Sequence, residues 1–197
     1  MTIKNTAKFI FAFVGFFFFF GLNSSQHVSA EENNESTQVL QELYLVIPED
    51  YKDFWNNIDY YVELDENNLP SLNIEAFLKQ YPSDTAYDFA IQMNSISIDI
   101  KNNGLQDTVD KMNRWLFPIG AYGNYCGKGN KGWDKKPIDD LDAACREHDK
   151  CFKGFFKNND KCNRDFVRRL LPIIQTNPGT KKGIYAMAAA KLFSYNI

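Results

Sequence analysis

The chain contains four cysteines, and all of them lie within one short window. They are Cys126, Cys145, Cys151 and Cys162. An even number of cysteines in a chain that passes through an oxidising compartment indicates disulfides, which hold a small fold together. Four cysteines allow three pairings, and their spacing alone does not choose among them. The spacing also lacks the C-x-x-C pairs of zinc modules, so disulfides are favoured over a zinc site.

The first 30 residues have the pattern of a secretory signal peptide. Lys4 and Lys8 give a positive start, an apolar run extends from Phe9 to Leu22, and Val28-Ser29-Ala30 supplies small residues for cleavage. The apolar run is shorter than the roughly 20 residues that a membrane-spanning helix needs. An uncleaved anchor is the alternative. We therefore expect residues 1–30 to be removed and the remaining protein to be secreted and extracellular.

Charge divides the rest of the chain into two parts. Residues 31–110 contain 17 Asp and Glu and 3 Lys, a net charge of −14, whereas residues 111–197 contain 17 Lys and Arg and 8 Asp and Glu, a net charge of +9. A basic half suits an anionic partner such as a phospholipid surface, and an equally good reading is that the two halves attract each other. We expect residues 111–197 to be the main domain and residues 31–110 to be an acidic N-terminal region, which is a removable pro-region, an accessory part or an integral part of one domain.

The hydrophobic pattern predicts a mainly α-helical protein, because strand signals are weak throughout. Residues 31–38 are polar and are predicted to lack regular structure. A short helix is predicted over residues 72–80, with Leu72, Ala76 and Phe77 on one face. A second helix is predicted over residues 105–116.

Further helices follow a glycine-rich loop over residues 120–132. Apolar residues at helical spacing predict a helix over residues 141–156. Another begins at Asp160 and runs to Leu171, where Pro172 is expected to stop or kink it. An alanine-rich helix is predicted over residues 184–193.

The loop and the helix that follows it carry groups suited to calcium-assisted hydrolysis. Calcium takes about six to eight oxygen ligands, and glycines at 127 and 129 allow a loop to turn its carbonyls inward. Asp149 is the candidate carboxylate ligand. The adjacent His148 projects about 100° away around the helix and can accept a proton near neutral pH. Once His27 is removed with the first 30 residues, His148 is the only histidine left.

Two motifs resemble one known family. Residues 122–129, Tyr-Gly-Asn-Tyr-Cys-Gly-Lys-Gly, resemble the calcium loop of secreted phospholipases A2, and Cys145-x-x-His148-Asp149-x-Cys151 resembles that family's active-site helix. The resemblance covers about residues 120–170, and residues 31–115 have no recognised counterpart. It implies two antiparallel disulfide-linked helices plus a calcium-binding loop, with an additional N-terminal helical or irregular region. It also implies the pairings Cys126–Cys145 and Cys151–Cys162.

The resemblance implies a reaction and a set of site residues. The reaction is calcium-dependent hydrolysis of the sn-2 ester of glycerophospholipids, which releases a fatty acid and a lysophospholipid. Ca2+ is implied to bind the carbonyls of Tyr125, Gly127 and Gly129 and the side chain of Asp149, where it stabilises the developing oxyanion. The implied catalytic residue is His148, as general base for the attacking water.

The chain departs from the family pattern at three positions. Ala144 replaces a second Cys, Phe152 replaces a Tyr, and Asn163 stands where an Asp usually orients the histidine. Asn can accept a hydrogen bond from the imidazole but cannot offset an imidazolium charge. Asp165 is the rival orienting residue, and Asn163 is favoured because the neighbouring disulfide fixes the helix register. These departures bear on the rate more than on the reaction.

Two functions remain open at this stage. A lone histidine on a half-apolar helix is more often structural than catalytic, but the flanking Asp149 and the glycine loop favour an active esterase. The alternative is a catalytically weak or silent phospholipase-like secreted protein that binds a membrane or a receptor. We expect a monomer that meets a phospholipid membrane or micelle surface and binds no nucleic acid. One set of side chains is either a membrane-docking patch or an ordinary solvated face: Arg164, Arg168, Arg169, Lys153, Lys157 and Lys161.

Overall fold

The computed structural model describes residues 23–65, 69–101, 122–127, 133–153 and 158–197. The chain divides into two compact units, Met1–Glu35 and Ser36–Ile197. The second unit holds the whole candidate site. The domain boundaries expected after residues 30 and 110 stay predictions. The helix predicted over residues 105–116 and most of the glycine-rich loop lie outside the described residues.

The described part of the fold is mainly helical, as predicted, with a small two-stranded sheet. The elements before residue 102 are α1 (Asn23–Val46), α2 (Glu49–Trp55), the 3-10 helix η1 (Ile58–Tyr61), β1 (Val62–Leu64), β2 (Pro70–Leu72), α3 (Ile74–Gln80) and α4 (Asp84–Lys101). The elements after residue 121 are α6 (Asp140–Cys151), α7 (Asp160–Thr176) and α8 (Lys181–Ser194). Strands β1 and β2 pair antiparallel, with Glu63 opposite Ser71.

The short helix α3 begins two residues later than predicted. Asn73 caps it, because its side chain accepts a hydrogen bond from the backbone N–H of Ala76 at 3.1 Å. Leu72 lies in β2 instead, where the Asn94 side chain bonds its N–H at 2.6 Å and its carbonyl at 2.7 Å. Phe77 is buried as predicted, whereas Ala76 is exposed.

One other prediction about the helices is wrong. Residues 31–38 were expected to be irregular but lie in α1, which continues into turns that bury Val39 and Leu43. Their spacing of four residues places these side chains on one helical face, so core packing favours a helix here.

The α7 helix also continues beyond the proline that was expected to stop or kink it. Pro172 is exposed, and the buried residues Leu170, Ile173 and Ile174 lie on both sides of it. A proline inside a helix costs about 3 kcal/mol, and burial of this apolar face offsets that cost. The preceding helix, α6, is shorter than predicted and ends at Cys151.

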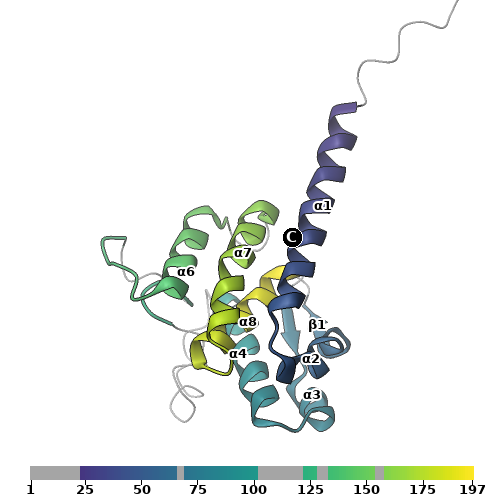
Figure 1. Ribbon diagram of the computed structural model, residues 1–197, viewed down its shortest axis with the longest axis vertical. Coiled ribbons are helices and arrows are strands. Elements are labelled where there is room, and N and C mark those ends of the chain that lie inside the picture. The colour runs from purple at the N-terminus through teal and green to yellow at the C-terminus, as the bar shows by residue number, and fades with distance from the viewer. Residues whose placement is uncertain (1–22, 66–68, 102–121, 128–132, 154–157) are drawn as a thin grey trace, which may run out of the picture. The chain divides into compact units, whose positions relative to one another are not determined.

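The core centres on α8. Every residue from Gly183 to Phe193 is buried, so this alanine-rich helix has neighbours all around it. It packs against α7 and against α4, and α6 packs against α7 (Figure 1). The acidic region and the basic region therefore share one hydrophobic core. No helix in the described part of the chain is long and apolar enough to cross a membrane.

Candidate active site

Two disulfides fix the frame of the candidate site. Cys126 is joined to Cys145, which ties the loop to α6, and Cys151 is joined to Cys162, which ties the end of α6 to the start of α7. Both pairings implied by the family resemblance are confirmed. The two helices are thereby held in a fixed register, so the side chains between the disulfides face each other reproducibly.

A buried carboxylate holds the loop against α6. Asp142 has no solvent exposure, and it accepts hydrogen bonds from the backbone N–H groups of Asn124 at 2.9 Å, Tyr125 at 2.8 Å and Ile138 at 3.0 Å. Gly123 has a φ of +67°, and a Cβ there would lie 2.3 Å from the Asp142 Cγ. Only glycine therefore allows the carboxylate to approach the loop this closely.

Sequence reasoning missed the role of Asp142. The residue lies three positions before Cys145 and seven before Asp149, so these three side chains share one face of α6. That spacing, on the helix that carries the loop disulfide, is the signal that could have identified it. An acidic residue in the first turn of a helix is otherwise explained by the helix dipole alone.

Tyr125 is anchored at both ends in the loop. Its ring is 1% exposed, its hydroxyl donates a hydrogen bond to the Lys135 carbonyl at 2.5 Å, and the Arg146 guanidinium lies 5.3 Å from the ring centroid. Arg146 also donates to the Trp133 carbonyl at 2.8 Å. These contacts fix the backbone of a residue whose carbonyl is a candidate calcium ligand.

The described part of the candidate calcium loop has oxygen donors that suit a hard cation. Gly127 has a φ of +97°, a conformation that favours glycine and lets the loop reverse its carbonyl direction. Asp149 is half-buried, and burial together with the negative charge of Asp142 raises the pKa of Asp149 to about 6. No described residue donates a hydrogen bond to the Asp149 carboxylate or forms an ion pair with it. A partly buried carboxylate of this kind gains most from a bound cation.

Part of the predicted ligand set remains undescribed. Gly129 lies outside the described residues, so its carbonyl is not placed. Among the described residues there is no group of three or more His, Cys, Asp and Glu that could hold a metal ion. A site of loop carbonyls with one carboxylate does not need such a group.

The His148 imidazole is enclosed by aromatic rings. It is 6% exposed, and its ring centroid lies 4.3 Å from that of Phe166, 4.6 Å from Phe193 and 4.9 Å from Phe152. Burial lowers the pKa of His148 to about 4, against a smaller opposite effect of its hydrogen bond with Asn163. The imidazole is therefore neutral near pH 7, which is the form that a general base requires.

The structure places Asn163, and not Asp165, beside the histidine. The Asn163 Oδ1 lies 3.0 Å from the His148 Nε2, and the Asn163 side chain is buried. Asp165 is turned away and forms an ion pair with Lys161 at 2.9 Å. The amide of Asn163 also donates a hydrogen bond to the main-chain carbonyl of Asn196 at 2.7 Å.

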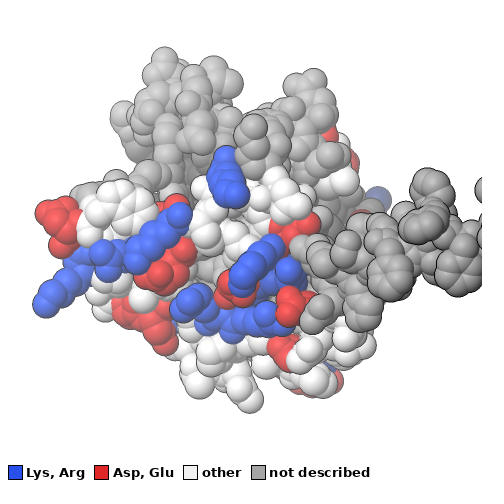
Figure 2. Space-filling view, turned by 90° about the horizontal axis from the view of Figure 1, so that it is seen from above, with Lys and Arg blue, Asp and Glu red and all other residues white. Residues whose placement is uncertain are grey.

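The basic side chains considered as a docking patch differ in their surroundings. Arg164 is buried, while Lys161 and Arg168 both lie near the carboxylate of Asp165. On the face shown in Figure 2, acidic side chains lie beside the basic ones. Lys157 lies outside the described residues.

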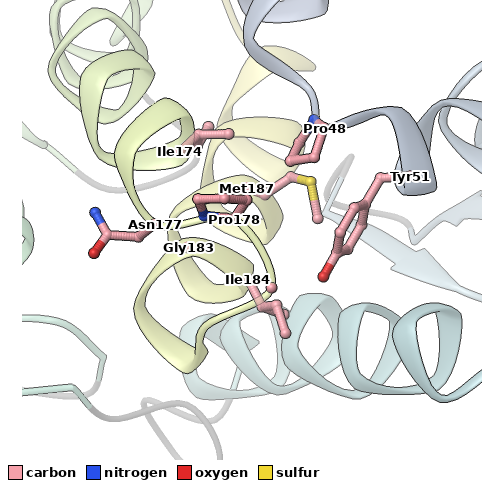
Figure 3. A pocket seen from close by; sticks show the side chains of 9 residues that line it. Pro48, Tyr51, Ile174, Asn177, Pro178, Gly183, Ile184 and Met187 are labelled. Atoms are coloured by element: carbon pink, nitrogen blue, oxygen red, sulfur yellow. The ribbon is translucent and has the colours of Figure 1, made fainter.

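The lining of one small apolar pocket does not include His148 (Figure 3). Residues from the α1–α2 connection, α2, α7, the α7–α8 turn and α8 line it: Pro48, Tyr51, Ile174, Asn177, Pro178, Gly179, Gly183, Ile184 and Met187. None of the predicted site residues is among them, so this pocket is not part of the candidate active site.

Comparison with known proteins supports the resemblance drawn from the two motifs. Residues 103–183 match the family described as phospholipase A2. The basic phospholipase A2 1 of Naja sagittifera is 48% identical over 52 residues, which are 26% of this chain and 37% of that protein. The part of the chain that is similar to phospholipases A2 therefore includes both disulfides and both motifs.

Two plant proteins extend the similarity. The probable phospholipase A2 homolog 1 of Oryza sativa subsp. japonica is 37% identical over 76 residues, covering 37% of this chain and 55% of that protein. Phospholipase A2-beta of Arabidopsis thaliana is 39% identical over 66 residues, covering 32% and 45%. The chain thus spans between about a third and just over half of the length of these relatives. No solved structure matches the chain.

Proposed function

We propose that this protein is a secreted, calcium-dependent phospholipase A2 that hydrolyses the sn-2 ester of glycerophospholipids. The observation that carries the proposal is the pair of positions on α6: a neutral His148 held by Asn163, and the neighbouring half-buried Asp149 on the helix tied to the loop. The family match over residues 103–183 supports the same reaction class.

His148 would perform the proton transfer, and Asn163 would hold it in position. Nε2 of His148 is engaged by Asn163, so Nδ1 is the nitrogen left to accept a proton from the attacking water. The aromatic rings around the imidazole exclude bulk water and keep it neutral until it takes that proton. Asn163 orients the ring and does not touch the reacting ester.

Calcium would be held by Asp149 and by the carbonyls of Tyr125, Gly127 and Gly129. When bound, it would supply the positive charge that stabilises the oxyanion formed at the ester carbonyl. The role of the chain is to keep the loop in place, which Asp142 and the Cys126–Cys145 disulfide do.

A phospholipid membrane or micelle is the proposed partner of a monomeric enzyme. Trp133 and Ile138 expose 48% and 63% of their surface beside the loop, and the exposed Lys135 and Lys136 lie between them. Apolar side chains with adjacent lysines suit an interface that has an acyl layer and anionic head groups. Secretion is supported by the leader-like first 30 residues and by the two disulfides.

The enclosed position of His148 favours a second candidate function. At 6% exposure and between three phenylalanines, the imidazole is placed as a core side chain would be. A phospholipase-like protein that binds a membrane or a receptor with little or no turnover would also have this geometry.

Fatty-acid release from phosphatidylcholine vesicles separates the two candidates. We expect release with calcium, its loss with a chelator, and a fall of at least about 100-fold in the His148→Gln variant, because the general base is then absent. The matched control is Asp165→Asn, which alters the rival carboxylate on α7 and should leave release unchanged. Release that survives both the chelator and His148→Gln would contradict the mechanism, and no release from the wild type would leave the binding function.

A further inference from the structure

We propose that the main-chain carbonyl of Asn196 is a positioning group for the active site, acting through Asn163. In this proposal, it fixes the orientation of the Asn163 amide, and the amide fixes the His148 imidazole in the Nε2–H tautomer. The segment that carries the carbonyl is braced from the acidic region by Asp59. The inference concerns the geometry of the site, and its role in catalysis rests on the proposed function.

The hydrogen-bonding capacities of the groups determine the tautomer. A main-chain carbonyl can only accept, so the group that faces Asn196 at 2.7 Å must be the Nδ2 amine of Asn163. The carbonyl end of the same amide, Oδ1, then faces His148 Nε2 at 3.0 Å and can also only accept. His148 must therefore donate from Nε2, and the lone pair of its neutral ring lies on Nδ1.

The same contact explains why Asn replaces the family's usual Asp at this position. A carboxylate at residue 163 would place an oxygen against the Asn196 carbonyl oxygen, with no hydrogen between them. Both groups are acceptors, and the site is buried, so the repulsion would not be screened by water. The Asn163 amide satisfies the histidine on one side and the carbonyl on the other. Asn163 is thus matched to the Asn196 segment of this chain.

Contacts with the acidic region hold the Asn196 segment in place. Tyr195, the residue before it, donates a hydrogen bond from its hydroxyl to Asp59 in η1. Lys191, one turn earlier in α8, forms an ion pair with the same carboxylate at 2.7 Å. The Lys191 ammonium lies 4.9 Å from the Tyr195 ring centroid and 5.5 Å from that of Trp55 in α2. The acidic region therefore braces the chain next to the positioning carbonyl.

Nitrogen-15 NMR of protein labelled at histidine tests the proposal directly. The chain has two histidines, so the His148→Gln variant identifies the signals of His27 and leaves those of His148 by difference. In the full-length wild type at neutral pH, we expect one His148 tautomer, protonated at Nε2, whose Nε2–H proton exchanges slowly with water. A His148 ring protonated at Nδ1 in the wild type would overturn the proposal.

Variants of Asn163 separate positioning from mere packing. In Asn163→Leu, which fills a similar volume without hydrogen-bonding groups, we expect loss of the exchange protection at Nε2 and a fall in kcat of about 10- to 100-fold, the range for removing a partner that orients a histidine. Asn163→Asp introduces the residue typical of the family, but we expect its Nε2 exchange protection and its kcat to be lower than those of the wild type. An Asn163→Asp protein with wild-type protection and equal or greater kcat would contradict the role of the Asn196 carbonyl.

A distant variant tests the brace. Tyr195→Phe removes only the hydroxyl that meets Asp59, so we expect the fold to persist while the Nε2–H proton of His148 exchanges at least about threefold faster. The control is Tyr60→Phe, which removes an exposed hydroxyl from the same 3-10 helix as Asp59 and should leave exchange unchanged. Equal exchange in Tyr195→Phe and the wild type would refute the brace. Because exchange is measured without substrate, an inactive wild type would count against the proposed function and leave this result readable.

Discussion

At the scale of single residues, the most consequential side chain in the described site is Asp142. A fully buried carboxylate is costly unless its oxygens are hydrogen-bonded, and here three backbone N–H groups meet that need. The carboxylate therefore favours the loop conformation that supplies these three donors. A loop fixed in advance does not lose conformational freedom when it binds a ligand.

Replacing Asp142 by Asn should destabilise the protein and weaken calcium binding. The Asn side chain keeps one acceptor oxygen, but its amine would face backbone donors, so at least one buried N–H loses its partner. We expect a loss of about 1–3 kcal/mol in the free energy of unfolding, measured by urea denaturation with the disulfides intact. Asp165→Asn is the control, because its exposed carboxylate meets only Lys161 and Arg168. A loss no larger than that of the control would show that Asp142 does not hold the loop.

At the scale of elements, the turn between α7 and α8 decides how closely these helices pack. Thr180 caps α8 by accepting a hydrogen bond from the backbone N–H of Gly183 at 3.1 Å. A Cβ on Gly183 would lie 1.9 Å from the main-chain carbonyl oxygen of Asn177. The absence of a side chain thus lets the first turn of α8 lie directly against the end of α7.

The variant Gly183→Ala should be destabilised even though alanine is the better helix former. The preference for alanine is worth about 1 kcal/mol, whereas the overlap involves backbone and forces α7 and α8 apart. We expect a net loss of about 1–3 kcal/mol, visible as a lower midpoint in chemical denaturation. Gly179→Asn in the same turn has no atom within 4 Å of its Cβ, and Asn tolerates the left-handed conformation found there, so it should change the midpoint much less. An unchanged or raised midpoint for Gly183→Ala would contradict the predicted packing.

The sequence predicted the elements that carry strong local signals and missed those set by distant contacts. The helix at Asp160 was predicted because Asp favours a helix start, and the helix over residues 184–193 was predicted because it is rich in alanine. The start of α3 was displaced by Asn94, which lies 22 residues from Leu72 along the chain and bonds its backbone. The continuation of α7 beyond Pro172 likewise depends on the burial of its neighbours, which no local pattern reveals.

In the candidate site, the motifs identified the histidine, its neighbouring carboxylate and the disulfides. They did not identify Asp142 or the carbonyl of Asn196. The carbonyl belongs to the backbone and has no sequence signature. The contact between Asn163 and Asn196 spans 33 residues, so only the fold brings these groups together.

At the scale of the whole molecule, charge links the two regions that differ so strongly in composition. Asp59 from the acidic region meets Lys191 and Tyr195 from the basic one. Burial alone would raise the pKa of Asp59, but the hydrogen bonds from Lys191 and Tyr195 outweigh it and hold that pKa below its ordinary value of 3.8. The contact is local, so it accounts for a small part of the attraction expected between the halves.

The stabilisation from Asp59 should therefore disappear in acid. A carboxylate whose pKa is lowered by folding stabilises the folded protein at any pH above its ordinary pKa. This stabilisation is lost as the pH falls through the lowered pKa. The Asp59 side chain is 62% exposed, so we expect Asp59→Asn to cost only about 0.2–1 kcal/mol at pH 7. Urea denaturation between pH 7 and pH 3 measures the difference from the wild type, with the exposed Asp53→Asn of α2 as control. A difference that grows as the pH falls would contradict the sign.

The burial of α8 on every side determines what removal of the acidic segment would expose. The face of α8 that packs against α4 is part of the protein interior. Removal of α4 would expose buried apolar side chains of α8 to water. Proteolytic removal of the acidic segment would therefore disrupt the core of the protein. The shortened product would need a lipid layer or another protein to cover the exposed apolar face of α8.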